Sequence, residues 1–197
     1  MRKAALAVLL SLAIPALAIP PVPRPAKEFT FVQPNGQKSL LTSMKGKVVV
    51  IQFLFTWCQH CQAFSQKLSK LEKDFAAKNV QFMGVAFDDN VQPALATSYA
   101  AKYATTFPVA YAPRETVLDF LGISVMERLG VPQLAVIDKK GVIRVQSEAI
   151  GASGELQNEA NLTKIINDLL AEGPGKASVK AAPAAPKATP DAAKKSE

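Results

Sequence analysis

Apolar residues follow two patterns along this chain. Three short runs, at 48–53, 80–87 and 134–137, are almost continuously apolar, which is typical of buried strands. After the first run, four apolar residues recur at intervals of three or four, which predicts a helix with one buried face. These residues are Phe64, Leu68, Leu71 and Phe75. The pattern predicts an α/β domain that contains a strand–helix–strand unit.

Weaker signals supply the remaining elements. Asn35-Gly36, a strong turn dipeptide, lies between two extended segments and predicts an N-terminal β-hairpin. Pro93 suits the first turn of a helix, where proline is favoured. The expected elements are hairpin strands at 28–32 and 37–41, a helix from 93 to about 103, a short strand at 107–111, a short helix at 117–121, a strand at 142–146 paired across the turn 138–141, and a last helix from about 155 or 159 to 170.

The first 18 residues differ in composition from the rest. Arg2 and Lys3 precede an apolar run that ends at the small-residue motif Ala16-Leu17-Ala18. This arrangement predicts a secretory signal peptide over residues 1–18, with an uncleaved membrane anchor as the alternative. We therefore expect a periplasmic or otherwise extracytoplasmic protein, in a compartment where disulfides persist.

Two further segments flank the predicted domain. Residues 19–26 are rich in proline and predict a stiff, extended spacer. Residues 173–197 hold 8 Ala, 4 Pro and 5 Lys and no aromatic residue, which predicts a disordered tail. Residues 27–172 remain as one domain. The net charge of +7 comes largely from the two ends and leaves the domain at about +2. With no basic stripe, the domain is not expected to bind nucleic acid.

Cys58 and Cys61 are the only cysteines, and they follow the first apolar run directly. A Cys-x-x-Cys pair where a strand turns into a helix is typical of a thiol–disulfide redox centre. The first cysteine then lies at a helix N-terminus, where free N–H groups and the helix dipole favour the thiolate, and only the thiolate attacks a disulfide. The second cysteine lies one turn further on and resolves the mixed disulfide.

Other uses of the pair fit less well. A purely structural disulfide across so short a loop would contribute only about 2 kcal/mol. Zinc normally takes four ligands, and His60 lies between the cysteines, where it does not easily join them on one metal. No metal and no cofactor is therefore expected. Asp88 and Asp89 follow the second apolar run, and such a pair is more typical of a solvated loop than of a cation site.

Several stretches, taken in order, resemble secreted thioredoxin-like proteins of the TlpA/ResA type, which are thiol–disulfide oxidoreductases. The matching stretches are 41–50, which leads into the predicted central strand, Trp57-Cys58-Gln59-His60-Cys61, Gly130-Val131-Pro132, and 136–141. The resemblance covers about Lys27 to Leu170. It implies a thioredoxin-like fold with a central mixed β-sheet flanked by helices, and a cis-proline at Pro132 packed beside Cys58. It also implies that the Val131 backbone pairs with a substrate strand and that Trp57 packs over the site.

Two positions depart from the family pattern. Thioredoxins carry a buried acid six residues before the first cysteine, where this chain has Gln52, which cannot titrate. Members that reduce apocytochromes c often carry a glutamate three residues after the second cysteine, where this chain has Phe64. The chain therefore lacks both familiar proton-handling acids.

The residues between the cysteines, Gln59 and His60, bear on the direction of electron flow. A protonated His60 near the helix N-terminus would stabilise the Cys58 thiolate and thus the reduced form, which makes the pair a stronger oxidant. Histidine at this position also resembles the dipeptides of disulfide oxidases and isomerases. The alternative is that His60 is an exposed residue without effect on the thiols.

These observations predict an enzyme that exchanges disulfides with cysteine-containing proteins and is recycled by a membrane thiol–disulfide partner. A non-catalytic chaperone or Cu(I)-handling module on a thioredoxin scaffold is an alternative, because thiols bind soft ions. A peroxiredoxin-type peroxidase is a further alternative. That chemistry needs a threonine three residues before the reactive cysteine, where this chain has Phe55, with Thr56 one position away.

Overall fold

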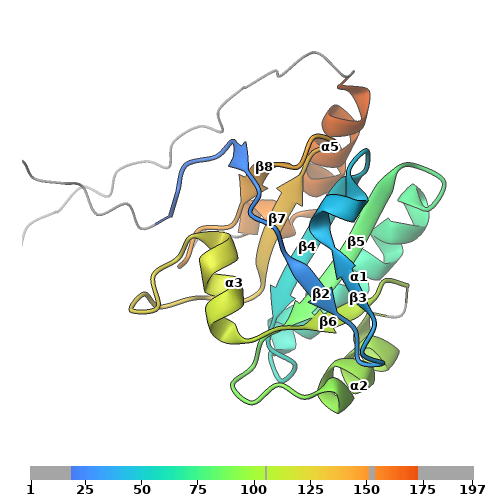
Figure 1. Cartoon of the computed structure of the whole chain (residues 1–197). Coiled ribbons are helices and arrows are strands. Elements are labelled where there is room, and N and C mark those ends of the chain that lie inside the picture. Colours follow the sequence, from blue (N-terminus) through green and yellow to red (C-terminus); the bar gives the residue numbers. More distant parts are fainter. Residues whose placement is uncertain (1–18, 105, 151–153, 173–197) are drawn as a thin grey trace, which may run out of the picture.

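The computed structural model describes residues 19–104, 106–150 and 154–172, whose strands form one mixed sheet (Figure 1). The strands are β1 (Arg24–Pro25), β2 (Thr30–Val32), β3 (Lys38–Leu40), β4 (Val48–Leu54), β5 (Val80–Ala86), β6 (Val109–Tyr111), β7 (Gln133–Ile137) and β8 (Val142–Gln146). Their order across the sheet is β1-β8-β7-β4-β5-β6-β2-β3. The parallel strands β4, β5 and β6 form its centre, and β7 joins β4 antiparallel.

Helices cover both faces of this sheet (Figure 1). They are α1 (Gln59–Phe75), α2 (Pro93–Tyr103), α3 (Arg114–Leu121), α4 (Gly154–Gln157) and α5 (Glu159–Ala171), and a 3-10 turn spans Leu41–Met44. Buried side chains of α1, α2, α4 and α5 pack on one face, and those of α3 pack on the other together with the N-terminal segment. The predicted α/β fold with a central mixed sheet and an N-terminal hairpin is confirmed.

Strand β4 shows why this sequence forms a central strand. All seven of its residues are buried, and successive side chains alternate between the two hydrophobic clusters. Val48, Val50 and Leu54 face the α1 side, whereas Val49, Ile51 and Phe53 face the α3 side. Gln52 is the one polar residue of this strand, and it is fully buried.

The helix after β4 also follows from the sequence. Its four predicted apolar positions are all buried, as the spacing indicates: Phe64, Leu68, Leu71 and Phe75. Helix α1 begins at Gln59, between the two cysteines, and its packing in one hydrophobic cluster with β4 and β5 fixes where they lie. Packing of this amphipathic face supplies most of the helix's stability.

Two segments differ in detail from expectation. The last helical region consists of α4 and α5 instead of one helix, because the Asn158 side chain accepts hydrogen bonds from the backbone N–H groups of Ala160 and Asn161 and so begins α5. Part of the expected spacer is attached to the domain, since Arg24 and Pro25 pair with β8. The Arg24 guanidinium also donates to the Gln146 side chain at 2.6 Å.

The predicted signal peptide and the predicted tail lie outside the described residues. Among the helices of the described segments, none has both the length and the hydropathy that a membrane crossing requires.

We expect Leu68→Ala to lower the free energy of unfolding by about 3 kcal/mol, because Leu68 is 2% exposed and its truncation leaves a cavity between α1 and the sheet. Urea unfolding measures this change. Leu95→Ala is the matched control, because Leu95 lies on α2 with 44% of its surface exposed. The control should change stability by about 0.5 kcal/mol or less. Equal losses in the two variants would contradict the packing of α1 against the sheet.

Candidate functional site

Cys58 lies where β4 gives way to α1. It is the N-cap residue of α1, and its sulfur accepts a hydrogen bond from the backbone N–H of Cys61 at 3.2 Å. The chain reaches this position through a tight turn in which the Cys58 N–H donates to the Phe55 carbonyl at 3.1 Å. The Cys58 sulfur therefore lies among the free N–H groups of a helix N-terminus, which stabilise a thiolate there.

The two thiols differ in their surroundings. Cys58 is half-buried, whereas Cys61 is fully buried, and both are free thiols in this structure. Burial raises the pKa of the Cys61 thiol well above its ordinary value, and its hydrogen bond with Cys58 raises that pKa further. The site thus holds one thiol that a large partner can reach and one that is sheltered behind it.

The loop before β7 brings a proline beside this pair. The Val131–Pro132 peptide bond is cis, as the resemblance implies, and the Val131 carbonyl lies 3.9 Å from the Cys58 sulfur. Gln133 holds the loop in place, because its side-chain amide donates to the carbonyls of Gly130 at 2.6 Å and Glu148 at 3.0 Å. The structure thereby brings together Cys58, Cys61, Val131 and Pro132 from segments far apart in sequence.

The other predicted site residues lie on the surface around Cys58. Trp57 is 70% exposed and stacks on Phe55, with 5.3 Å between the ring centroids. Phe55 in turn packs on Phe87 at 4.6 Å. Gln59 and His60 are exposed in the first turn of α1. The indole therefore adds an apolar surface to the rim of the site and is not buried over the thiols.

Beneath the pair lies a buried polar network that the sequence did not reveal. The Gln52 side-chain amide donates to the Cys61 carbonyl at 3.1 Å, and its oxygen accepts from the Ser65 hydroxyl at 2.7 Å. The hydroxyls of Ser65 and Tyr99 lie 2.8 Å apart. Burial raises the pKa of Tyr99, so its phenol stays protonated at neutral pH. This neutral chain of groups links β4, α1 and α2 directly below the two cysteines.

Gln52 interrupts the first apolar run, and Ser65 is a second signal for this network. Ser65 lies four residues after Cys61, on the same face of α1 as the apolar residues Phe64 and Leu68. A hydroxyl on a face that is otherwise apolar has to find a partner inside the protein. Nothing in the sequence, however, indicates that this partner is Gln52 on one side and Tyr99 on the other.

Asp88 corrects one expectation. It was expected in a solvated loop but is only 6% exposed, and its Oδ1 accepts hydrogen bonds from the Thr56 backbone N–H at 2.8 Å and the Thr56 hydroxyl at 3.1 Å. Its neighbour Asp89 is exposed, as expected. Asp88 is thus a structural part of the turn that carries the cysteines. Within the described residues, no group of three or more His, Cys, Asp or Glu side chains is placed to hold a metal ion.

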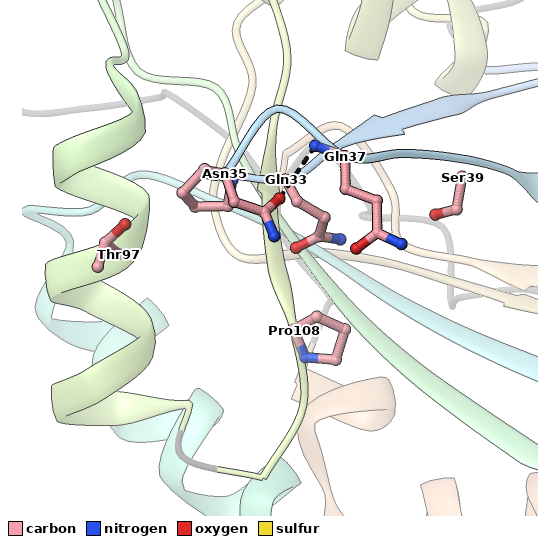
Figure 2. Close-up of a pocket in the computed structure, with 7 residues that line it drawn as sticks. Gln33, Asn35, Gln37, Ser39, Thr97 and Pro108 are labelled. Atoms are coloured by element: carbon pink, nitrogen blue, oxygen red, sulfur yellow. Dashed lines mark hydrogen bonds between the residues drawn. The ribbon is translucent and has the colours of Figure 1, made fainter.

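A surface pocket lies away from the cysteines, near the start of β6, between the N-terminal hairpin turn, α2 and Pro108 (Figure 2). Its lining residues are Gln33, Pro34, Asn35, Gln37, Ser39, Thr97 and Pro108. Because Pro108 precedes β6, whereas Cys58 follows the end of the parallel strand β4, this pocket is not part of the thiol site. Its polar side chains serve the turn itself, since Asn35 Oδ1 accepts from the Gln37 N–H at 3.0 Å.

Comparison with known proteins agrees with this geometry. Residues 22–146 match the model of the AhpC/TSA family. The chain is 30% identical over 121 residues to the thioredoxin-like protein YneN of Bacillus subtilis (strain 168), a match that covers 60% of this chain and 66% of YneN, just under two thirds. It is 27% identical over 140 residues to the thiol-disulfide oxidoreductase ResA of Bacillus thuringiensis (strain Al Hakam), covering 71% of this chain and 76% of ResA.

A solved structure shows the same fold. The thiol:disulfide interchange protein of the thioredoxin family from Chlorobium tepidum TLS superposes with a TM-score of 0.61 at 25% identity. The superposition covers 77% of this chain and 99% of that protein. The expected thioredoxin-like fold is therefore confirmed.

The difference between the thiols should appear in alkylation by iodoacetamide. At pH 7.5 we expect Cys58 to be labelled more than about tenfold faster than Cys61, because Cys61 is buried and its raised pKa leaves less thiolate at that pH. As pH rises, labelling of Cys61 should increase only at strongly alkaline values. Peptide mapping by mass spectrometry measures both rates. Protein unfolded in urea is the control and should lose the difference, whereas equal rates in the folded protein would contradict the sheltered position of Cys61.

Proposed function

Since this chain belongs to the AhpC/TSA family, as a thioredoxin-like thiol–disulfide oxidoreductase of the TlpA/ResA type, we propose that it exchanges disulfides with cysteine-containing proteins outside the cytoplasm. One observation carries the proposal: a half-buried cysteine at a helix N-cap has a second, buried cysteine one turn behind it. A nucleophile must be reachable and partly ionised, and a resolving thiol must be close and protected from other partners.

The exchange proceeds in two displacements. The Cys58 thiolate attacks one sulfur of a substrate disulfide, which forms a mixed disulfide and releases the other substrate sulfur as a thiolate that takes up a proton. Cys61 then loses its proton and attacks the Cys58 sulfur. This breaks the mixed disulfide and releases the second substrate thiolate. The substrate gains two electrons and the Cys58–Cys61 pair becomes a disulfide. The same steps in reverse oxidise a dithiol substrate.

The surface next to Cys58 suits an extended polypeptide. The cis Val131–Pro132 segment lies directly beside the Cys58 sulfur and offers backbone groups to a substrate strand. Trp57 and Phe55 provide an apolar rim for side chains that flank the substrate cysteine. Protein cysteines, rather than small thiols alone, are therefore the substrates that we assign to this site.

The predicted signal peptide at 1–18 supports a periplasmic or otherwise extracytoplasmic location. Each turnover leaves the pair in the opposite redox state, so a second thiol–disulfide protein has to restore it. In such a compartment that recycling partner is a membrane protein that carries electrons to or from the pair.

Variants at the two cysteines test the assignment. Cys58→Ser should abolish disulfide exchange with a model substrate, because the remaining thiol, Cys61, is buried and out of a substrate's reach. Cys61→Ser should still attack but should accumulate a mixed disulfide, because nothing resolves it. Insulin reduction and non-reducing gels measure the two outcomes. Full exchange by Cys58→Ser, or trapping by Cys58→Ser instead of Cys61→Ser, would reject the proposed roles of nucleophile and resolving thiol.

We also propose that His60 stabilises the Cys58 thiolate from the solvent side. In a glutathione equilibrium, His60→Ala should favour the disulfide by about threefold, which corresponds to roughly 15 mV. The effect should be larger at pH 7 than at pH 9, because histidine loses its positive charge as pH rises and attracts a thiolate only while it is protonated. Gln59→Ala is the matched control, since Gln59 is also exposed in the first turn of α1. If the two variants have the same potential at both pH values, His60 has no part in tuning the pair.

A further inference from the structure

Asp88 is a buried carboxylate that the exchange mechanism does not use. It follows the end of β5, next to the position where β4 passes into the turn that carries the cysteines. Its Oδ1 accepts both the backbone N–H and the hydroxyl of Thr56. The Thr56 carbonyl is held from the other side, because it accepts from the Gln62 side chain at 2.9 Å. Thr56, two residues before the nucleophile, is thus fixed at both of its backbone polar groups.

The second oxygen of this carboxylate is unusual. Asp88 Oδ2 is buried and has no hydrogen-bond partner among the described residues. A buried carboxylate is normally paired with a cation or fully hydrogen-bonded, because burial of an uncompensated charge is costly. Since two bonds to Thr56 would also be available to an amide or hydroxyl oxygen, holding the turn does not by itself explain why an acidic residue occupies this position.

The Asp88 carboxylate lies close enough to the pair to act on the Cys61 thiol. Burial and the hydrogen bond with Cys58 are the larger causes of the raised pKa of Cys61, and the negative charge of Asp88 adds to them. An anion near the pair opposes ionisation of either thiol in the reduced protein, whereas the disulfide carries no charge to oppose. The carboxylate therefore destabilises the reduced form relative to the oxidised form.

We propose that Asp88 is a positioning residue that holds the active-site turn through Thr56 and sets the redox balance of the pair by its charge, making the protein a weaker oxidant. This inference rests on the proposed function, because it assigns a direction of tuning to the same pair. Other titratable or charged groups lie at this end of the sheet: the thiols of Cys58 and Cys61, His60 of α1, Asp89, Tyr99 of α2 and Arg114 of α3. Asp88 is buried, whereas His60 and Asp89 are exposed and Arg114 is half-buried.

The test is the equilibrium of each protein with reduced and oxidised glutathione, followed from pH 6 to pH 9. In this reaction the two thiols give two electrons and two protons to oxidised glutathione, which yields two molecules of reduced glutathione and the Cys58–Cys61 disulfide. Asp88→Asn removes the charge and keeps an oxygen for both Thr56 hydrogen bonds. We expect its equilibrium constant for disulfide formation to fall about tenfold at pH 9, a shift of about +30 mV.

The pH profile separates charge from structure. Only a thiolate senses the carboxylate, so the difference from the parent protein should be small at pH 6 and should widen as thiolate forms at higher pH. Two controls accompany the variant: Asp89→Asn removes the same charge from the exposed neighbour, and Thr56→Val removes one hydrogen bond and keeps the charge. Asp89→Asn should follow the parent profile, and any shift caused by Thr56→Val should have the same size at pH 6 and pH 9, because the Asp88 carboxylate remains.

Asp88→Ser, which is also neutral, repeats the test if the asparagine variant does not fold. An equilibrium constant equal to that of the parent at every pH in the folded neutral variant would overturn the proposal. So would a shift of equal size at pH 6 and pH 9, since a change in turn geometry would not follow thiol ionisation. If the parent protein itself does not exchange with glutathione, the proposed function fails instead, and the two failures are therefore distinguishable.

Discussion

The hydrogen bond from the Cys61 backbone N–H to the Cys58 sulfur is the contact on which the site depends. It makes Cys58 the N-cap of α1, so the helix begins between the two cysteines. This hydrogen bond forms only if β4 and α1 keep a fixed position relative to each other. Their relative position comes from the wholly buried β4 and from the apolar face of α1, which share one hydrophobic cluster with β5. The hydrophobic core thus determines the position of the sulfur, although the core residues carry no redox chemistry.

Most of this scaffold follows from the sequence by simple physical rules. The apolar runs specify β4, β5 and β7, and the spacing of Phe64 and Leu68 specifies the buried face of α1, because burial periodicity is local information. The Cys-x-x-Cys pair at the end of the first run likewise indicates where the chemistry lies. The cis-proline came from the family resemblance and not from periodicity, since nothing local identifies one X–Pro bond as cis.

The buried polar groups could not be predicted in the same way. Gln52 in a strand and Tyr99 on a helix each have several compatible environments, and only the folded chain places both against Ser65. Asp88 shows the same difficulty more sharply, because an acidic pair after a strand usually faces water. The structure buries one member of the pair and exposes the other, and the partner that decides this, Thr56, lies 32 residues away in the chain. Long-range partners of polar groups carry no periodic signal.

The roles that we propose for His60 and Asp88 give these two side chains opposite effects of unequal strength on the pair. His60 lies in water, where a high dielectric constant and salt weaken its influence on a neighbouring thiolate. Asp88 acts through the protein interior, where the same charge at the same distance interacts several times more strongly. A histidine between the cysteines therefore does not by itself make this protein a strong oxidant. In this proposal the reduction potential of the pair depends on the buried Asp88 carboxylate as well as on the residues between the two cysteines.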